Sequence, residues 1–213
     1  MNTTATTATP AIQVPDAIGA PFEGGFYGGK IRIGIAIFAI VWAPKAEGEI
    51  KGCWLDSYTD VPGATSCFDS MANTQAMAAA GSAMAQQALA ANIGGLTDWC
   101  IPARDVLEMG YRYLKPTTQE NYCSFRDGDN ASSIPPGYPY TEANPVQTPI
   151  EAFQAGNAEA FETDGYYWSS TQSSEISAFI QGFSYGGQYN VGYKDNQRRC
   201  RFVRLIPLNP SIL

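Results

Sequence analysis

The side chains that most often perform catalysis are scarce in this 213-residue sequence. Histidine is absent, which removes the usual general base and the commonest transition-metal ligand, and which excludes a Ser–His or Cys–His nucleophile. No two cysteines form a C-x-x-C pair, so neither a disulfide framework nor a thiolate zinc site is expected. Buried free thiols are the simpler interpretation of Cys53, Cys67, Cys100, Cys123 and Cys200.

Carboxylates are spread along the chain rather than gathered in pairs: Asp56, Asp60, Asp69, Asp98, Asp105, Asp127, Asp129 and Asp164. The run RDGDN at 126–130 could open a calcium loop, but the later acidic residue that completes an EF-hand is missing. A solvated turn is therefore expected there. We predict a protein that is not an enzyme and that needs no cofactor and no metal ion.

Molecular recognition is the chemistry that the C-terminal region indicates. The run YYWSSTQSSEISAFIQGFSYGGQ at 166–188 combines aromatic side chains with Ser, Gly and Gln. Nine of the 37 residues in 166–202 are aromatic, against 12% of the whole chain. This composition is typical of antibody combining loops, in which aromatic rings give contact area and small polar residues give adaptable hydrogen bonds. We expect a core that holds Trp168, Phe183 and Phe202, and a surface that presents Tyr185, Tyr189 and Tyr193.

The strands that would position these residues follow from the hydrophobic pattern. Ile- and Val-rich residues 30–44 predict a long buried strand that turns and returns at 49–56, which makes a β-hairpin. Residues 116–165 are rich in Pro, Gly and Asn and predict a long loop, which is uncommon unless the loop has a function. Residues 166–208 alternate short apolar runs with Gly turns and predict the terminal strands.

Two helices are expected between the hairpin and the long loop. Residues 69–95 predict a helix that Asp69 or Ser70 caps and that two glycines end. One face of this helix is expected to pack on the core through Met77, Ala80, Met84, Ala88 and Ala91. Residues 98–116 predict a second helix that starts at Pro102. Strands, two helices, a long loop and terminal strands together predict an α+β fold with an antiparallel sheet.

Charge and hydropathy restrict the partners. The net charge of −7 argues against nucleic acid, and the cluster of Arg198, Arg199, Arg201 and Arg204 is expected to form structural pairs. The most apolar run, 33–43, is far shorter than the roughly 18 residues that a membrane span needs. The first residues lack the features of a secretion signal, so synthesis in a cytoplasm is expected. The Pro- and Thr-rich residues 1–23 predict an extended arm that docks on another subunit.

Several motifs resemble one known family. The runs GGLTDWCIPARDVLEMGY, YYWSSTQ, SAFIQGFSYGGQ and RCRFVRLI, with IFAIVWAPKAEGEIKG before them, resemble the C-type-lectin-fold domains of phages and bacteria (the DUF1566 kind). The resemblance covers about residues 25–208. It implies a C-type lectin-like fold over 24–213, preceded by the arm of 1–23.

The same layout resembles phage receptor-binding proteins that retroelements diversify between the W-S-S motif and the C-terminal R-x-V-R. That resemblance implies a variable, exposed ligand-binding set on the late strands. Its members would be Ser173, Glu175, Ile176, Ser177, Phe179, Gln181, Tyr185, Gln188, Tyr189, Asn190 and Tyr193.

The expected function is therefore that of a non-enzymatic phage virion protein, a tail fibre, tail tip or receptor-binding subunit assembled in the host cytoplasm. Its partners would be other virion subunits, through the arm, and a host cell-surface protein or glycan. A homo-oligomer is expected, with a trimer as the working assumption. The alternative is an architectural head-decoration or tail subunit without receptor binding. The formylglycine-generating oxidases share the implied fold, but they need paired cysteines where Cys200 stands alone.

Overall fold

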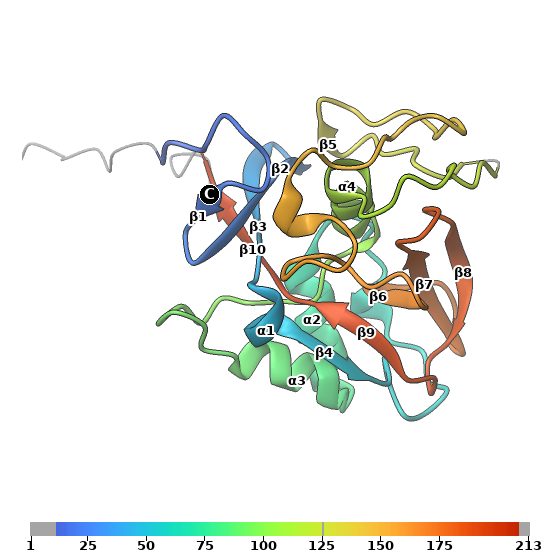
Figure 1. Cartoon of the computed structure of the whole chain (residues 1–213). Helices are drawn as coiled ribbons and strands as arrows, with labels where there is room; N and C mark the ends of the chain where they lie inside the picture. The colour runs from blue at the N-terminus through green and yellow to red at the C-terminus, as the bar shows by residue number, and fades with distance from the viewer. Residues whose placement is uncertain (1–11, 125, 209–213) are drawn as a thin grey trace, which may run out of the picture.

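A computed structural model describes residues 12–124 and 126–208 of the chain. These residues form two five-stranded sheets and four α-helices, an α+β arrangement as the sequence predicted (Figure 1). The helices are α1 (Lys45–Gly48), α2 (Ser70–Ala79), α3 (Ala83–Ala90) and α4 (Arg104–Leu114). Two 3₁₀ turns, η1 (Pro62–Ala64) and η2 (Glu151–Phe153), lie in the connections.

The first sheet joins the two ends of the described chain. It has the order β1–β2–β3–β10, with β5 also paired to β2, and all its pairs are antiparallel. Its strands are β1 (Pro21–Phe22), β2 (Gly25–Ile33), β3 (Ala36–Trp42), β5 (Ser133–Ile134) and β10 (Val203–Pro207). Because β10 pairs directly with β3, the last strand closes the fold against the first hairpin.

The second sheet carries the aromatic C-terminal region. Its order is β4–β9–β6–β7–β8, so β8 is an edge strand. Its strands are β4 (Glu49–Gly52), β6 (Tyr166–Gln172), β7 (Ser177–Gly182), β8 (Gln188–Tyr193) and β9 (Arg198–Arg201). The terminal strands were predicted correctly, but β6 and β9 run parallel, so this sheet is not purely antiparallel.

The predicted hairpin of 30–44 with 49–56 is wrong. The run that looked like one strand is divided at Gly34, whose φ of 60° allows a turn that an Ile would resist. The hairpin is instead β2–β3, in which Ile33 pairs with Ala36. The strand at 49–52 pairs with β9 at the other end of the chain.

The predicted helix of 69–95 is two helices. Gly81 adopts a φ of 97° between them, and the Ser82 side chain accepts a hydrogen bond from the Ala85 N–H to cap α3. The predicted cap Asp69 is confirmed, because its side chain accepts from the Ala72 N–H. Of the predicted core face, Met77, Met84 and Ala88 are buried, Ala91 is half-buried and Ala80 is exposed.

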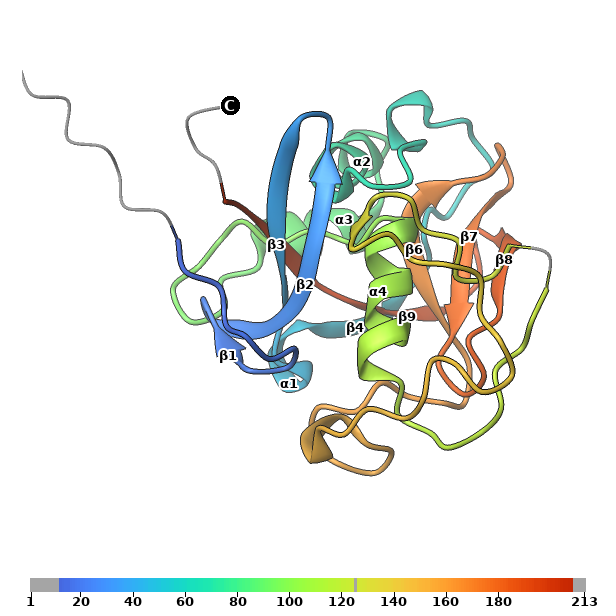
Figure 2. The ribbon, with the colours of Figure 1, turned by 90° about the horizontal axis from the view of Figure 1, so that it is seen from above.

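The second predicted helix exists as α4, which begins at Arg104 rather than at Pro102. Figure 2 shows α4 between the β2–β3 hairpin and strands β6–β8. The Thr171 hydroxyl accepts from the Arg104 N–H at 2.9 Å, and the Ser170 N–H donates to the Pro102 carbonyl at 2.8 Å. Backbone and side-chain hydrogen bonds therefore join the runs IPAR (101–104) and YWSST (167–171), which are far apart in the sequence.

The core has two parts, on the two faces of β6. Trp168 packs with α2, α3 and Phe202 on one face, while Tyr167 packs with α4 and Phe183 on the other. All four of these aromatic side chains are at most 1% exposed. The expected core positions of Trp168, Phe183 and Phe202 are therefore confirmed.

The expected arm and the domain boundary after residue 23 need correction. Val14, Ile18 and Phe22 pack against the chain's own core, and the Gly19 N–H donates to the Tyr27 carbonyl at 2.7 Å. This segment packs its apolar side chains on the core of its own domain, so it is part of the domain. Residues 1–11 of the expected arm lie outside the described residues.

Candidate functional site

Four tyrosines from three separate segments meet beside β8, and we call Tyr122, Tyr166, Tyr185 and Tyr189 the tyrosine cluster. The ring of Tyr189 lies 5.6 Å from that of Tyr166 and 6.1 Å from that of Tyr122, measured between centroids. Tyr122 and Tyr185 are also 6.1 Å apart, and the hydroxyls of Tyr166 and Tyr185 are 3.0 Å apart. These separations are typical of interacting aromatic pairs.

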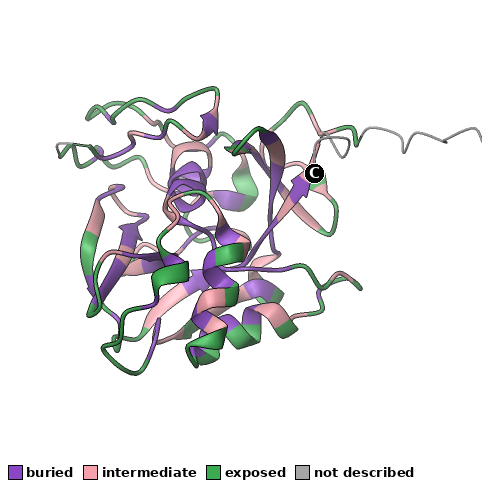
Figure 3. Cartoon of the chain, turned by 180° about the vertical axis from the view of Figure 1, so that it is seen from behind, coloured by how far each residue is buried: buried purple, intermediate pink, exposed green. Residues whose placement is uncertain are grey.

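A β-bulge decides which side chains of β8 join the cluster. Ile180 pairs with Tyr189 and Ala178 pairs with Gly192, so β8 has one more residue than β7 between these pairs. Tyr189 and Gly192 therefore lie on the face of Ile180, although their spacing of three would separate them in a regular strand. Exposed and half-buried residues of β8 line the outer edge of this sheet (Figure 3).

Two glycines shape the turn from β7 to β8. Gly186 has a φ of 82°, and a Cβ there would lie 2.3 Å from a ring carbon of Tyr111. A Cβ on Gly187 would lie 2.9 Å from the Tyr189 ring and 3.0 Å from the Tyr185 ring. The backbone thus approaches these rings more closely than any other residue type would allow.

The long loop places Tyr122 in the cluster. The Tyr122 N–H donates to the Tyr185 carbonyl at 2.7 Å. Next to it, the buried Asn121 side chain accepts from the Tyr111 hydroxyl at 2.6 Å and from Lys115 Nζ at 2.8 Å. Its amide group donates to three loop carbonyls, so the side chain is well satisfied although only 5% exposed. Asn121 therefore acts as a buried anchor for the loop.

A second buried network fixes the loop that underlies β8. Glu108 of α4, 1% exposed, accepts from Asn130 at 2.7 Å, from the Tyr140 hydroxyl at 2.8 Å and from Arg112 at 2.8 Å. Burial raises the pKa of the Glu108 carboxyl, and these three donors act in the opposite direction. Gln181 donates to the Tyr140 hydroxyl at 3.1 Å and so joins the network to β7.

Of the four clustered arginines, three form the expected structural pairs. Arg199 pairs with Asp164, Arg201 with Glu159 and Arg204 with Asp98. Arg198 differs, because no ion pair of this side chain occurs among the described residues. Its guanidinium carbon lies 5.3 Å from the Tyr166 ring centroid and 5.2 Å from that of Trp168. Burial lowers the pKa of Arg198.

Two hydroxyls of the cluster, those of Tyr166 and Tyr189, keep their protons at neutral pH, because each has a raised pKa. The hydrogen bond with Tyr185 raises the pKa of Tyr166, and burial raises the pKa of Tyr189. Each hydroxyl can therefore both donate and accept a hydrogen bond. Rings that stack and hydroxyls that hydrogen-bond are suited to binding a polar ligand without a reaction.

The predicted site residues are only partly exposed. Ser177 and Gln181 are buried, at 7% and 1%, and the expectation that they are exposed is wrong. Both side chains form hydrogen bonds inside the protein. Gln181 donates to the Tyr140 hydroxyl, and the hydroxyls of Ser177 and Ser174 lie 2.7 Å apart. The half-buried members are Ser173, Phe179, Tyr185, Gln188 and Tyr189, and the exposed members are Glu175, Ile176, Asn190 and Tyr193.

The predicted residues do not form one surface, because alternation divides them between two faces of the sheet. Tyr185 and Tyr189 join the cluster, whereas Gln188 accepts from the Gly128 N–H at 2.9 Å on the opposite face. Phe179, beneath the Arg104 guanidinium, also lies on that face. Tyr193 pairs with Ser177, at the end of β8 away from the cluster.

Sequence reasoning missed three residues of this site. Tyr166 shares a face with Trp168 by the two-residue period of β6, so the motif YYW contained a signal for it. Arg198 was expected to form an ion pair like Arg199, Arg201 and Arg204, so its different role was not predicted. Nothing in the sequence around Tyr122 indicates that it meets Tyr185, because this contact depends on the path of the long loop.

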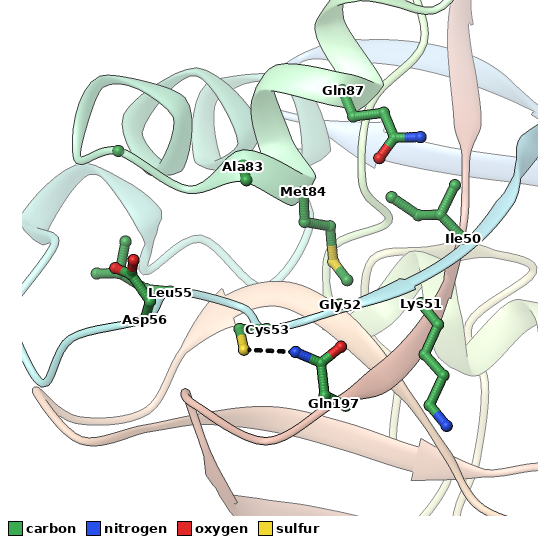
Figure 4. Close-up of a pocket in the computed structure, with 11 residues that line it drawn as sticks. Ile50, Lys51, Gly52, Cys53, Leu55, Asp56, Ala83, Met84, Gln87 and Gln197 are labelled. Atoms are coloured by element: carbon green, nitrogen blue, oxygen red, sulfur yellow. Dashed lines mark hydrogen bonds between the residues drawn. The ribbon is translucent and has the colours of Figure 1, made fainter.

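A cavity lies elsewhere, between β4 and α3, with a volume of about 320 Å³ (Figure 4). Ile50, Leu55 and Met84 form its apolar part. The Cys53 thiol donates to the Asp195 carbonyl at 3.0 Å and accepts from Gln197 at 3.0 Å. Neither partner is a base, so the cavity shows no activated nucleophile.

The cysteines are free, but the expectation that all are buried is wrong. Cys100 and Cys200 are buried, Cys53 and Cys67 are intermediate, and Cys123 is exposed. Residues 12–124 and 126–208 contain no group of three potential metal ligands. The run RDGDN forms a turn, as expected, in which Arg126 pairs with Asp129 at 2.7 Å. The expectation that the turn is solvated is wrong, because Asp127 and Asn130 are buried. No helix in the described part of the chain has the length and apolar character to cross a membrane.

Comparison of the chain with protein-family models, with curated proteins and with solved structures finds no match. The site is therefore interpreted from its own geometry.

Proposed function

We propose that this protein is a non-enzymatic phage virion protein that binds a host-surface ligand through the tyrosine cluster of a C-type lectin-like domain. The observation that carries the proposal is the convergence of Tyr122, Tyr166, Tyr185 and Tyr189 beside an edge strand. These residues come from three segments, the long loop, β6, and the turn that leads into β8 with the start of β8, and their rings contact one another. Buried polar anchors hold the segments in place.

The architecture supports the fold part of the proposal. The first and last strands lie in one sheet, as in a lectin-like base, and strands β6–β8 lie on the other side of α4 (Figure 2). The loop runs from Pro116 to β6 with only short regular elements, and such loops commonly carry function when a rigid scaffold holds them.

The chemistry of the cluster supports the binding part. Tyrosine rings lose little conformational entropy on binding because they have two side-chain torsions, and they present an apolar face with a polar tip. Tyr122 is 45% exposed, so a ligand can reach the cluster. Aromatic residues of this kind commonly contribute about 2 kcal/mol or more at an interface.

Host adsorption of matched tyrosine variants tests the proposal. Tyr122→Ala and Tyr185→Ala should lower binding of monovalent protein to host cells at least tenfold, with little change in thermal stability. Tyr193→Ala is the matched control, because Tyr193 is a 54% exposed tyrosine on β8 outside the cluster. Whole particles should be measured as well, since many copies can conceal a weakened single site through avidity.

Normal adsorption by both cluster variants would contradict receptor binding by this surface. The architectural alternative, a head-decoration or tail subunit, would then be favoured. Trp168→Ala is the control for folding, because truncation of this fully buried ring should cost roughly 3–5 kcal/mol.

A further inference from the structure

Arg198 is the arginine of the C-terminal cluster whose charge has no protein partner among the described residues. Arg199 lies 2.8 Å from Asp164, and Arg201 and Arg204 contact Glu159 and Asp98. Arg198 makes no side-chain hydrogen bond in the described part of the chain, and its buried Nε lacks an acceptor. An intermediate exposure separates this side chain from the freely hydrated arginines of a surface.

Protein structures seldom leave such a group unsatisfied. A buried donor without an acceptor destabilises the folded state. The rings of Tyr166 and Trp168 offset part of this cost, because a cation is attracted to the face of an aromatic ring. Neither side chain, however, accepts a hydrogen bond from the N–H groups of the guanidinium. The terminal N–H groups of Arg198 are not among the buried atoms and have no acceptor in the described part of the chain, so they remain free to donate to a ligand.

The guanidinium is continuous with the tyrosine cluster. It lies over the Tyr166 ring, and Tyr166 contacts both the hydroxyl of Tyr185 and the ring of Tyr189. The nearest regular pairing of Arg198 is with Gly52 of β4, which presents no charge. A ligand that stacks on the tyrosines would therefore place its substituents within reach of an unpaired cation.

We propose, on the basis of the proposed function, that the ligand is an acidic glycan. Its sugar rings stack on the tyrosine cluster, and a carboxylate or phosphate oxygen accepts hydrogen bonds from the free terminal N–H groups of Arg198. A guanidinium matches the two oxygens of either anion, and charge-assisted bonds of this type are roughly twice as strong as neutral ones. The net charge of −7 disfavours anions in general, so this recognition depends on one local cation.

A glycan array with matched pairs tests this inference directly. Each acidic oligosaccharide is printed beside its neutral parent: 3′-sialyllactose with lactose, a galacturonate trimer with a galactose trimer, and a phosphorylated mannotriose with mannotriose. Monovalent wild-type protein should bind the acidic member of at least one pair at least tenfold more tightly. The pairs with a carboxylate and the pair with a phosphate distinguish the two sources of the anion.

Variants at the cation complete the test. Arg198→Gln should reduce binding of the acidic glycan to the level of its neutral parent, and Arg198→Lys should retain part of the preference. Arg32→Gln is the matched control, because Arg32 is an exposed arginine of β2 and its loss changes the net charge equally. Thermal melting of each variant confirms folding.

The outcomes separate this inference from the proposed function. Equal binding of acidic and neutral glycans, no glycan binding at all, or an acidic preference that survives in Arg198→Gln would overturn the acidic-glycan inference. If the tyrosine variants still lose host adsorption in those cases, receptor binding stands without it. If the tyrosine variants adsorb normally, the proposed function and the inference both fail.

Discussion

Lys194 gives a quantitative test of how the second sheet is held to the segment before η1. This lysine follows β8 and is 0% exposed. Its Nζ donates to the Thr59 carbonyl at 2.7 Å and to Gln172 at 2.6 Å, and it lies 4.6 Å from the Trp54 ring centroid. These acceptors are neutral, and burial lowers the pKa of Lys194 to about 8.

The sign of the pH dependence follows from this shift. The unfolded chain binds a proton at this lysine up to its ordinary pKa of roughly 10.4, whereas the folded chain releases it near pH 8. Between these values the unfolded state binds more protons, so the contribution of Lys194 to stability rises with pH. From pH 7 to 9.5 the linkage relation gives an increase of roughly 2 kcal/mol, with 1.36 kcal/mol for each pKa unit.

Urea unfolding at several pH values, for wild type and Lys194→Met, measures this contribution. The difference in unfolding free energy between the two proteins should change by about 2 kcal/mol in favour of wild type as the pH rises from 7 to 9.5. The difference also removes the effects of buried thiols and tyrosines, which both proteins share. Lys51→Met, which alters an exposed lysine of β4, controls for the type of substitution.

A flat difference over this range would refute the reasoning. It would mean that the Lys194 ammonium ion is hydrated in the folded protein, and that Thr59 and Gln172 do not enclose it as the hydrogen bonds indicate.

Three further predictions concern the turn, the buried arginine and metal content. Gly186→Ala should destabilise the fold by roughly 1–3 kcal/mol in urea unfolding, because its φ is 82° and its Cβ would meet the Tyr111 ring; unchanged stability would contradict the turn geometry. Arg201→Ala should cost about 3–5 kcal/mol, because it leaves Glu159 and the Ala43 carbonyl without their donor, and a smaller loss would show that water replaces the guanidinium. Elemental analysis should find no stoichiometric transition metal, since the chain has no histidine; one bound ion per chain would reject that expectation.

Features that depend on neighbouring residues could be predicted from the sequence. The Asp69 cap is a local hydrogen bond, and the terminal strands follow from a period of two residues. The burial of Trp168 follows from the size of its aromatic ring and its position in a predicted strand. Each of these depends on a few consecutive residues, so the chain needs no distant contact to specify it.

The strand pairings could not be predicted without the tertiary structure. A strand at 49–52 has the same alternation of side chains whether it pairs with β3 or with β9. It pairs with β9 because folding brings the C-terminal part of the chain next to it. Gln181 was predicted to be exposed because its side chain is polar. Its polarity alone does not show that the Tyr140 hydroxyl accepts its hydrogen bond inside the protein. Buried polar residues are satisfied by groups that lie far away in the sequence.

The sequence determined the tyrosine cluster only in part. Composition indicated an aromatic surface near the C-terminus, but the bulge in β8 decided that Tyr189 and Gly192 share a face. An insertion of one residue reverses the alternation of every later side chain, so the pattern alone assigns no residue beyond it to a face. The path of the long loop then brought Tyr122 to Tyr185, a contact that depends on packing rather than on any local pattern.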